Sequence, residues 1–306
     1  MTRSHPPSLI TLAERTLREE CGVRPGERVL VAVSGGADST ALLAVLSRLA
    51  PRLRLELEAH GVDHGLRAEA AAELDSAAEL ARRLGVRFER TILRVEPGGN
   101  LQARARHERY TALERARERC RAALIATAHH ADDRAETVLL RLLRGAGPRG
   151  LAVLPARAGS RIRPLIRARR AAIEAHLGRH GLAFARDPSN QDRRFLRVRV
   201  RLDVLPLLEA ASPRIVEHLC ALADELGGPP APVVLGEDGR PLALGRAQLG
   251  ALRRAQALGL LEARIPLSDG RILALDRQTR TPVLLGPPAS VAGSRRRGDA
   301  KPRSRS

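Results

Sequence analysis

The sequence predicts an α/β fold in which helices wrap a parallel sheet. Short apolar runs such as residues 29–33 are β-branched and uninterrupted, which is typical of strands buried on both faces of a parallel sheet. In the first half of the chain these runs alternate with segments that have a helical spacing of leucine and alanine. Alternation of this kind predicts right-handed crossovers, which place helices on both faces of the sheet.

Four strands and the helices between them can be placed along the first half. The strands are expected at residues 29–33, 53–62, 86–95 and 122–128. Helices are expected after the first strand and at residues 68–84, 101–119 and roughly 132–143. Ligands of such sheets bind outside the carboxyl ends of the strands, so the segments that follow the strands are the candidate binding segments.

The chain changes character after residue 144, where loops and arginine clusters replace the alternation. A helix is expected at 169–181, and another starts at Ser212-Pro213, because proline suits the first helical position. We divide the chain into a main domain (1–210), a helix with a Gly/Pro linker (211–232), a small, divergent appended domain (233–288) and a basic disordered tail (289–306).

The composition points to a polyanionic partner. The 306 residues carry a formal net charge of +19, and arginine supplies nearly all of the positive charge because Lys301 is the only lysine. Guanidinium groups match phosphates geometrically, which favours nucleic acid, although a GC-rich genome would also enrich arginine. One tyrosine, three phenylalanines and no tryptophan do not supply an aromatic platform for single-stranded bases.

Cysteine usage favours a reducing compartment. Cys21, Cys120 and Cys220 are widely separated and form no C-x-x-C pair, which argues against a disulfide framework, a zinc ribbon or an iron–sulfur site. The sequence shows no signal peptide and no long apolar run. We therefore expect a soluble, cytoplasmic protein that does not associate with membranes.

A glycine loop follows the first predicted strand, and its residues are Ser34, Gly35, Gly36, Ala37, Asp38 and Ser39. A strand, a glycine turn and a helix N-terminus direct backbone N–H groups and the positive end of the helix dipole into one concavity, which suits a phosphate. The serines add hydroxyl donors, and Asp38 could hold a metal ion. The loop is neither a Walker loop nor a G-x-G-x-x-G motif, and an ordinary capped turn is the alternative.

A second polar cluster follows the fourth predicted strand and contains His129, His130, Asp132, Asp133 and Glu136. At a strand-to-helix junction these side chains could coordinate Mg²⁺ and contact a triphosphate. A helix cap with acidic residues that complement the helix dipole would explain the carboxylates but not the paired histidines. Zinc is less well supported, because no cysteine is near and the spacing is not His-Glu-x-x-His.

Three further segments are weaker candidates. His64 lies after the second strand, where a neighbouring glycine suggests a tight turn near a nucleotide. The predicted helix 101–119 carries arginines that could face phosphates or form an ordinary solvated face: Arg104, Arg106 and Arg109. Residues 187–192 are rich in turn formers, and plain turn chemistry explains them equally well.

Together the segments resemble a known family. They read SGGADS, HGVDHGLR, ARHERYTAL, TAHHADDRAETVLLRLLRGAGPRGL, RPLI and DPSNQDRRFLRVRVR. Their order and spacing resemble those of the tRNA(Ile)-lysidine synthases, which belong to the N-type ATP pyrophosphatases with an adenine-nucleotide alpha-hydrolase-like fold. The resemblance covers about residues 25–210. Val198 stands where the family usually has asparagine, and the region after residue 211 is short and matches poorly.

The resemblance implies a reaction and a set of cofactors and partners. ATP would adenylate the carbon-2 oxygen of the wobble cytidine in a tRNA(Ile) with a CAU anticodon, and free L-lysine would then displace AMP. The implied cofactors are ATP and Mg²⁺, and the implied partners are that tRNA and free lysine. The oligomeric state stays open, with a homodimer as one candidate. A tRNA 2-thiolation enzyme of the same superfamily and a non-catalytic RNA-binding protein with a relict nucleotide fold are the alternatives.

The resemblance also implies roles for individual residues. ATP would contact the glycine loop 34–39 and His64, and Mg²⁺ would be held by Asp38 and Asp133. The implied catalytic residues are Asp38, His129, Asp132, Asp133 and Glu136. Asp132 and Glu136 are candidates for holding the lysine ammonium or for acting as a base. The implied tRNA contacts are Arg104, Arg106, Arg109, Arg197 and Arg199. Residues 1–210 would form the catalytic domain, and 233–288 would be a candidate tRNA-binding domain.

Overall fold

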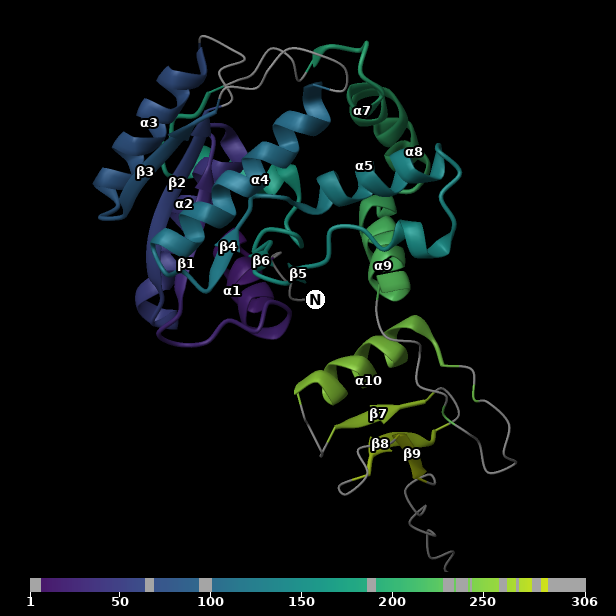
Figure 1. Cartoon of the computed structure of the whole chain (residues 1–306). Helices are drawn as coiled ribbons and strands as arrows, with labels where there is room; N and C mark the ends of the chain where they lie inside the picture. Colours follow the sequence, from purple (N-terminus) through teal and green to yellow (C-terminus); the bar gives the residue numbers. More distant parts are fainter. Residues whose placement is uncertain are drawn as a thin grey trace, which may run out of the picture. The chain divides into compact units, whose positions relative to one another are not determined.

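The computed structural model divides the chain into two compact units, Met1–Gly228 and Pro229–Ser306 (Figure 1). In the first unit it describes residues 7–63, 69–93, 101–185 and 191–227. In the second it describes residues 234, 242, 244–258, 263–267, 270–276 and 282–285. His64 and residues 186–190, which include most of the DPSN segment, therefore lie outside the described residues.

The first unit is built on a six-stranded sheet with the strand order β3-β2-β1-β4-β6-β5. Its strands are β1 (Arg28–Val33), β2 (Glu56–Asp63), β3 (Arg87–Ile92), β4 (Leu124–Ala126), β5 (Arg157–Ala158) and β6 (Arg161–Ile162). The pairs are parallel, except that the short β5 runs antiparallel to β6. The predicted α/β class with a parallel sheet is confirmed.

Alternate residues of β1 face two different helical layers. Val29 and Val31 pack in the main core, whereas Leu30 packs with Ile125 and Leu113 on the other side of the sheet. The main core is shared with α1 (Leu9–Glu19), α2 (Ala37–Leu53), α3 (Glu69–Arg83) and α6 (Arg170–Arg179), and the opposite face is covered by α4 (Leu101–Arg119). Burial on both faces explains why this strand reads as an unbroken apolar run.

The second predicted strand begins later than expected. Residue 53 is the last residue of α2, and Arg54 follows it with a φ of 53°. This left-handed cap ends the helix at Leu53, so β2 starts only at Glu56. Leu53 and Leu55 are both buried, as they would also be in a strand, so the pattern of apolar residues could not show where the helix ends and the strand begins.

A group of short helices completes the first unit: α5 (Ala131–Leu142), η1 (Pro148–Leu151), α7 (Leu196–Arg199), the π-helical segment η3 (Val200–Val204), α8 (Leu205–Ala211) and α9 (Ile215–Gly227). A separate apolar cluster joins α5, η1, α8 and α9. The helix α9 packs along α5, so both belong to the first compact unit (Figure 1).

The second unit pairs one helix with a small antiparallel sheet. Its elements are α10 (Arg246–Leu258), β7 (Arg264–Pro266), β8 (Ile272–Leu275) and β9 (Pro282–Leu285). The helix contributes Leu252 and the sheet contributes Leu273 to their common core. Between β7 and β8, Gly270 has a φ of 82°, a left-handed conformation that glycine adopts readily. Across the described residues, every helix is too short or too polar to traverse a bilayer.

Candidate active site

The glycine loop connects β1 to α2. Gly36 caps α2 with extended backbone and without a side-chain cap hydrogen bond, so the first N–H groups of α2 are left for another acceptor. Ser39 holds the loop, because its Oγ accepts a hydrogen bond from the amide of Ser34 at 3.1 Å and donates to the carbonyl of Gly36 at 3.0 Å. The loop therefore presents a helix N-terminus that suits an anion.

Two features require a glycine at position 35: a left-handed backbone conformation and the close approach of Glu73. Its φ is 80°, and a Cβ there would lie 2.8 Å from the carbonyl carbon of Glu73 on α3 and closer still to its oxygen. The loop and the start of α3 can approach each other this closely only because residue 35 has no side chain.

A third segment that the sequence did not indicate also borders the loop. The amide of Ala185 donates to the carbonyl of Gly35 at 3.0 Å, and Ala185 forms a parallel bridge with Gly36. This contact brings the chain after α6 alongside the loop, immediately before the part of the DPSN segment that lies outside the described residues.

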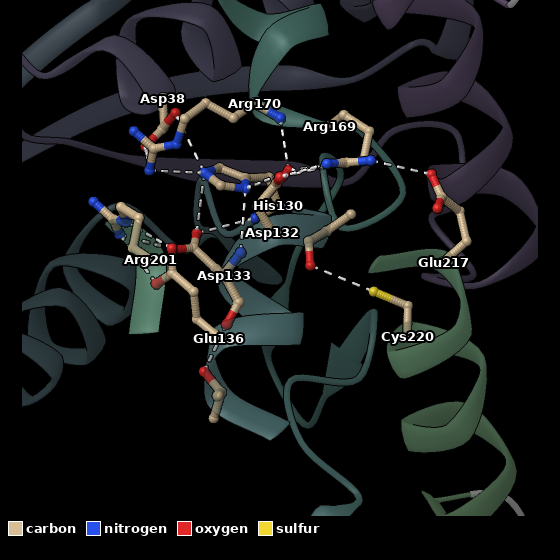
Figure 2. Close-up of polar contacts among 12 residues, drawn as sticks. Asp38, His130, Asp132, Asp133, Glu136, Arg169, Arg170, Arg201, Glu217 and Cys220 are labelled. Atoms are coloured by element: carbon tan, nitrogen blue, oxygen red, sulfur yellow. Dashed lines mark hydrogen bonds and ion pairs between the residues drawn. The ribbon is translucent and has the colours of Figure 1, made fainter. Parts of the chain in front are cut away.

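His130 is the N-cap of α5, and the cap is a reciprocal pair. The Asp133 amide donates to Nδ1 of His130 at 3.3 Å, and the His130 amide donates to the Asp133 carboxylate at 3.2 Å. Figure 2 shows the His130 ring between Asp38, Asp132 and Asp133. The sequence analysis gave a helix cap with acidic residues as the alternative for this cluster, and in the structure the His130 ring is the cap. The ring also links α5 to the glycine loop.

Three carboxylates surround the buried His130 ring. Its Nε2 lies 3.6 Å from Asp38 and 3.5 Å from Asp133, and its Nδ1 lies 3.6 Å from Asp132. Burial lowers the pKa of His130, but these carboxylates outweigh burial and raise the pKa to about 9. The amide contact of Nδ1 favours the neutral ring, whereas the carboxylates favour the charged ring.

Asp38 and Asp133 fit a Mg²⁺ ion. Both carboxylates face the same ring nitrogen of His130, and the Oδ1 atom of Asp38 is buried without a hydrogen-bond partner. Over the described residues there is no group of three side chains that could enclose a metal ion. Mg²⁺ commonly binds one or two carboxylates, with phosphates and waters completing its octahedron, so two carboxylates beside a phosphate site are sufficient.

Glu136 and Asp133 are paired with two arginines that follow the DPSN segment. Glu136 is fully buried and accepts hydrogen bonds from Nε of Arg197 at 2.9 Å and Nε of Arg201 at 2.6 Å. Arg197 also donates to Asp133 at 2.9 Å. Burial alone would raise the pKa of Asp133, but the charges of His130 and Arg197 lower it below the ordinary range. Asp133, Arg197 and Arg201 thus form one wall of the site, and the buried Glu136 lies behind them between the two arginines.

Arg201 was not among the predicted site residues, although its spacing from Arg197 indicates a shared position. Arg197 and Arg201 are four residues apart, which places them on one face of a helical segment. The segment is π-helical from Val200 to Val204, a distortion that frequently accompanies functional sites. Arg197, predicted from the sequence to contact tRNA, is paired with the carboxylates of α5 and lines the cavity, and Arg199 is exposed.

His129 points into the site from the end of β4. Its Nδ1 lies 3.1 Å from Oγ1 of Thr127. Burial lowers the pKa of His129 to about 3, so the ring is neutral near pH 7. The two adjacent histidines therefore differ: His129 can exchange a hydrogen bond with a ligand without carrying charge, and His130 joins the carboxylates.

Asp132 turns away from the glycine loop toward α6. Its carboxylate accepts hydrogen bonds from the side chain of Arg169 at 3.1–3.3 Å and from the amide of Arg170 at 2.8 Å. Burial alone would raise the pKa of Asp132, but the hydrogen bonds from His130, Arg169 and Arg170 lower it. Arg170 reaches the site as well, with its NH2 group 3.3 Å from Nε2 of His130.

The α4 arginines gather around the only tyrosine of the chain. Guanidinium groups lie 5.0–5.4 Å from the centroid of the Tyr110 ring and belong to Arg106, Arg109 and Arg161. In the described part of the chain these three have no ion pair with a carboxylate. Arg104 is partly buried in the same helix. We call the four residues Tyr110, Arg106, Arg109 and Arg161 the Tyr110 cluster.

One cavity of about 1440 Å³ collects most of these groups. Its lining includes residues from the glycine loop, the end of β2, α4, the end of β4, α6 and α7, among them Asp38, His60, Arg109, His129, Asp133, Arg170 and Arg197. Asp132 and Glu136 are not part of the lining. The volume exceeds the range of about 300–1,000 Å³ that is usual for one small ligand, so the cavity has room for a nucleotide and a second substrate.

Comparisons with known proteins agree with this geometry. A sequence model of the PP-loop domain matches residues 10–208. The chain is 38% identical over 293 residues to the tRNA(Ile)-lysidine synthase of Thermobifida fusca, and the match covers 90% of each protein. The chain belongs to the tRNA(Ile)-lysidine synthase family.

Two other relatives extend further than this chain. The tRNA(Ile)-lysidine synthases of Symbiobacterium thermophilum and Pseudomonas syringae pv. tomato are 44% and 41% identical over 216 and 222 residues. These matches cover 67% and 71% of this chain but only 44% and 49% of the relatives. The chain thus spans about half the length of these two members of the tRNA(Ile)-lysidine synthase family.

A solved structure shares the fold. The U34-tRNA thiolase NcsA from Methanococcus maripaludis, with its 4Fe-4S cluster, superposes with a TM-score of 0.61 at 17% identity, covering 76% of this chain and 84% of that protein. At this identity the likeness concerns the fold alone.

Proposed function

We propose that the protein uses ATP to join free L-lysine to carbon 2 of the wobble cytidine of a tRNA(Ile) with a CAU anticodon. The observation that carries the proposal is that the glycine loop and the start of α5, about 90 residues apart in the sequence, line one cavity that also reaches the Tyr110 cluster. Membership of the tRNA(Ile)-lysidine synthase family supports the same reaction.

In the first step the carbon-2 oxygen of cytidine attacks the α-phosphorus of ATP, and pyrophosphate leaves. The N–H groups at the start of α2 hold the triphosphate, and the neutral His129 ring offers it a further hydrogen bond. Asp38 and Asp133 would hold Mg²⁺, and the ion would supply positive charge to offset that of the departing pyrophosphate. The chain's main contribution is position, because phosphoryl and nucleotidyl transfer need little covalent help from a protein.

In the second step the ε-ammonium of lysine gives a proton to water, the neutral amine forms a bond to carbon 2, and the C–O bond breaks so that AMP leaves with the oxygen. The new C–N nitrogen then releases a second proton to water. Adenylation is needed because an unactivated carbonyl oxygen is a poor leaving group and AMP is a good one. The wall formed by Asp133, Arg197 and Arg201 carries both signs of charge, which suits an amino acid with a carboxylate and two ammonium groups. Glu136, like Asp132, lies behind the cavity surface, where it holds Arg197 and Arg201 in place.

The RNA would approach across the Tyr110 cluster. Its three guanidinium groups repel one another and lack carboxylate partners within the described residues, so phosphates would relieve the repulsion. Arg104 lies on the same helix, and Arg199 is exposed at the end of α7. A role of residues 233–288 in tRNA binding and a homodimer stay predictions.

Sulfur transfer has less support from the site. Cys21 and Cys220 are buried, and burial raises their pKa to about 12 and about 11. None of the three cysteines lines the described cavity. A thiolate nucleophile therefore has no candidate at the place where a nucleotide would be activated.

The proposal is tested with the full chain, ATP and Mg²⁺, a tRNA(Ile) transcript with a CAU anticodon, and radiolabelled lysine. Pyrophosphate release should require the transcript, and label should enter the RNA only when ATP and lysine are both present. A transcript with uridine at the wobble position serves as the control. Label-free RNA that gains sulfur from a sulfide donor, or tight RNA binding without pyrophosphate release, would reject the proposal in favour of thiolation or a relict fold.

A further inference from the structure

The start of α5 is held from behind by α9. Sγ of Cys220 donates a hydrogen bond to the carbonyl oxygen of Ala131 at 3.4 Å, one residue after His130 (Figure 2). Ala131 and Ala135 of α5 are buried in one apolar cluster with Val216 and Leu219 of α9. The catalytic turn of α5 therefore has two sides, one toward the cavity and one toward α9, and its position depends on both.

A single guanidinium connects this turn to two other helices. Arg169 immediately precedes α6, and its Nε and NH2 groups donate to Asp132 at 3.2 and 3.1 Å. The same NH2 group contacts Glu209 of α8, and NH1 donates to Glu217 of α9 at 3.4 Å. Figure 2 shows Arg169 between Asp132 and Glu217.

Asp132 passes this connection on to His130. Its carboxylate is occupied by Arg169, the amide of Arg170 and the Nδ1 side of the His130 ring, and it does not line the cavity. The opposite nitrogen of the same ring faces Asp38 and Asp133. A shift of Asp132 would rotate or displace the ring, and the ring lies between the two carboxylates that fit Mg²⁺.

We propose that Arg169 is a positioning residue, which ties α8 and α9 to the catalytic turn through Asp132 and so sets the orientation of His130. This inference refines the site of the proposed function and rests on it for the kinetic assay. It assigns Asp132 to the supporting structure rather than to substrate contact. Small misplacements of groups around a reacting centre can reduce a rate by about 100-fold. Arg169 can therefore affect turnover through Asp132 and His130 without any contact to substrate.

The chain supplies a matched control two residues away. Arg167 also bridges to α9, with NH1 2.5 Å from Asp224, and it reaches Glu20, the residue after α1, at 2.6 Å. Within the described residues Arg167 pairs with neither Asp132 nor Asp133; it shares Asp224 with Arg134 of α5, which keeps this carboxylate as its own partner when Arg167 is removed. Arg167→Gln and Arg169→Gln each remove an arginine that forms an ion pair with α9. Only Arg169→Gln also removes the hydrogen bonds that hold the Asp132 carboxylate.

The first experiment compares kcat and KM for ATP in pyrophosphate release, together with melting temperature. Arg169→Gln should lower kcat by about 10- to 100-fold while KM for ATP changes by less than about threefold. Arg169→Lys, which can still meet Asp132, should recover part of the loss. Arg167→Gln should lose a similar amount of thermal stability and keep the wild-type kcat. Equal kcat in the two glutamine variants, measured below both melting temperatures, overturns the inference.

A second experiment cuts the connection at its far end. The double variant Glu209→Gln/Glu217→Gln leaves Arg169 and Asp132 intact and should lower kcat by about three- to tenfold, again with little change in KM. An unchanged kcat would show that α8 and α9 do not act through Arg169. Because these substitutions are partly exposed, they also cover the case in which Arg169→Gln does not fold.

A third measurement needs neither RNA nor lysine. In the substrate-free protein, the ring C–H resonances of His130 should shift in Arg169→Gln and stay unchanged in Arg167→Gln. Shifts without any pyrophosphate release by the wild type would leave the inference standing and reject the proposed function. If the wild type releases pyrophosphate but the His130 resonances of Arg169→Gln do not shift, the proposed function stands and the inference on Arg169 is rejected.

Discussion

The glycine loop and the first turn of α5 form two sides of one cavity, yet they are built in opposite ways. The loop has few side-chain contacts: Gly36 provides no side-chain cap, and Oδ1 of Asp38 has no hydrogen-bond partner. The turn is saturated, with Asp132, Asp133 and Glu136 each accepting hydrogen bonds from arginines. The glycine loop therefore keeps hydrogen-bonding capacity for a ligand, whereas the protein's own arginines hold the carboxylates of the α5 turn in place.

The difference teaches where substitutions should cost activity and where they should cost stability. The Asp38 carboxylate lies 3.6 Å from His130 and 4.0 Å from Arg170, and its buried Oδ1 accepts no hydrogen bond, so it should contribute less to folding than to ligand binding. A buried carboxylate between arginines contributes to folding first, because its loss leaves positive charges uncompensated. The following variants test this division.

The largest effect is expected from the loop. Asp38→Asn should reduce pyrophosphate release by about 10³-fold, because it removes a charge aimed at the metal and the phosphates. The free energy of unfolding and RNA retention should stay close to wild type. Asp75→Asn, on the exposed side of α3, is the control for loss of one carboxylate. An active Asp38→Asn variant would reject the metal assignment and with it the contrast between the two sides.

The turn should respond in stability. Glu136→Gln should lower the free energy of unfolding by about 3 kcal/mol, since Arg197 and Arg201 lose a fully buried counter-charge. Urea unfolding at pH 7 measures the change. Glu79→Gln removes an exposed partner of Arg82 and should leave stability unchanged. If the two variants behave alike, the charges of α5 are not structural.

The backbone of the loop is a separate case that sharpens the comparison. Gly35→Ala should cost about 2–3 kcal/mol, because it combines a left-handed φ with a collision against Glu73. Gly26 has a similar φ of 86° but nothing within 4 Å of a Cβ, so Gly26→Ala should cost only about 1 kcal/mol. Thermal or urea unfolding separates the two terms. Equal costs would mean that the contact with Glu73 is relaxed in solution.

The smallest effect is the pH dependence of Asp132. Its pKa is lowered in the folded protein, so its contribution to stability is present above the unfolded pKa of about 3.9 and is lost as the pH falls. The stability difference between wild type and Asp132→Asn should be constant from about pH 6 to pH 5, below the range in which the His130 contribution changes, and should narrow by about 1 kcal/mol by pH 3. Urea titrations at each pH measure it, and a difference that widens in acid contradicts the ion-pair description.

Much of the site could be predicted from the sequence, because its short-range parts follow local rules. A β-branched run, a glycine turn and a helix start are contiguous, so the loop could be placed by inspection. The same holds for His130 and Asp133, whose spacing of three residues is that of a reciprocal cap. The family motifs then ordered these segments along the chain.

The arginines of residues 167–201 could not be assigned in this way. Many arginines compete for few carboxylates in this chain, and which of them meet is decided by tertiary packing rather than by spacing. Arg169 and Arg201 find Asp132 and Glu136 across more than 35 residues. For the same reason Arg197 was expected on an RNA-facing surface, while the fold turns it toward α5.

The strand order β3-β2-β1-β4 has one more consequence. After β1 the chain adds β2 and β3 on one flank, then returns to place β4 on the other, so growth of the sheet reverses direction at β1. In open α/β sheets a crevice forms at such a topological switch point, outside the carboxyl ends of the strands. The glycine loop and the start of α5 are therefore neighbours because β1 and β4 are paired, and not because of the geometry of the residues between them.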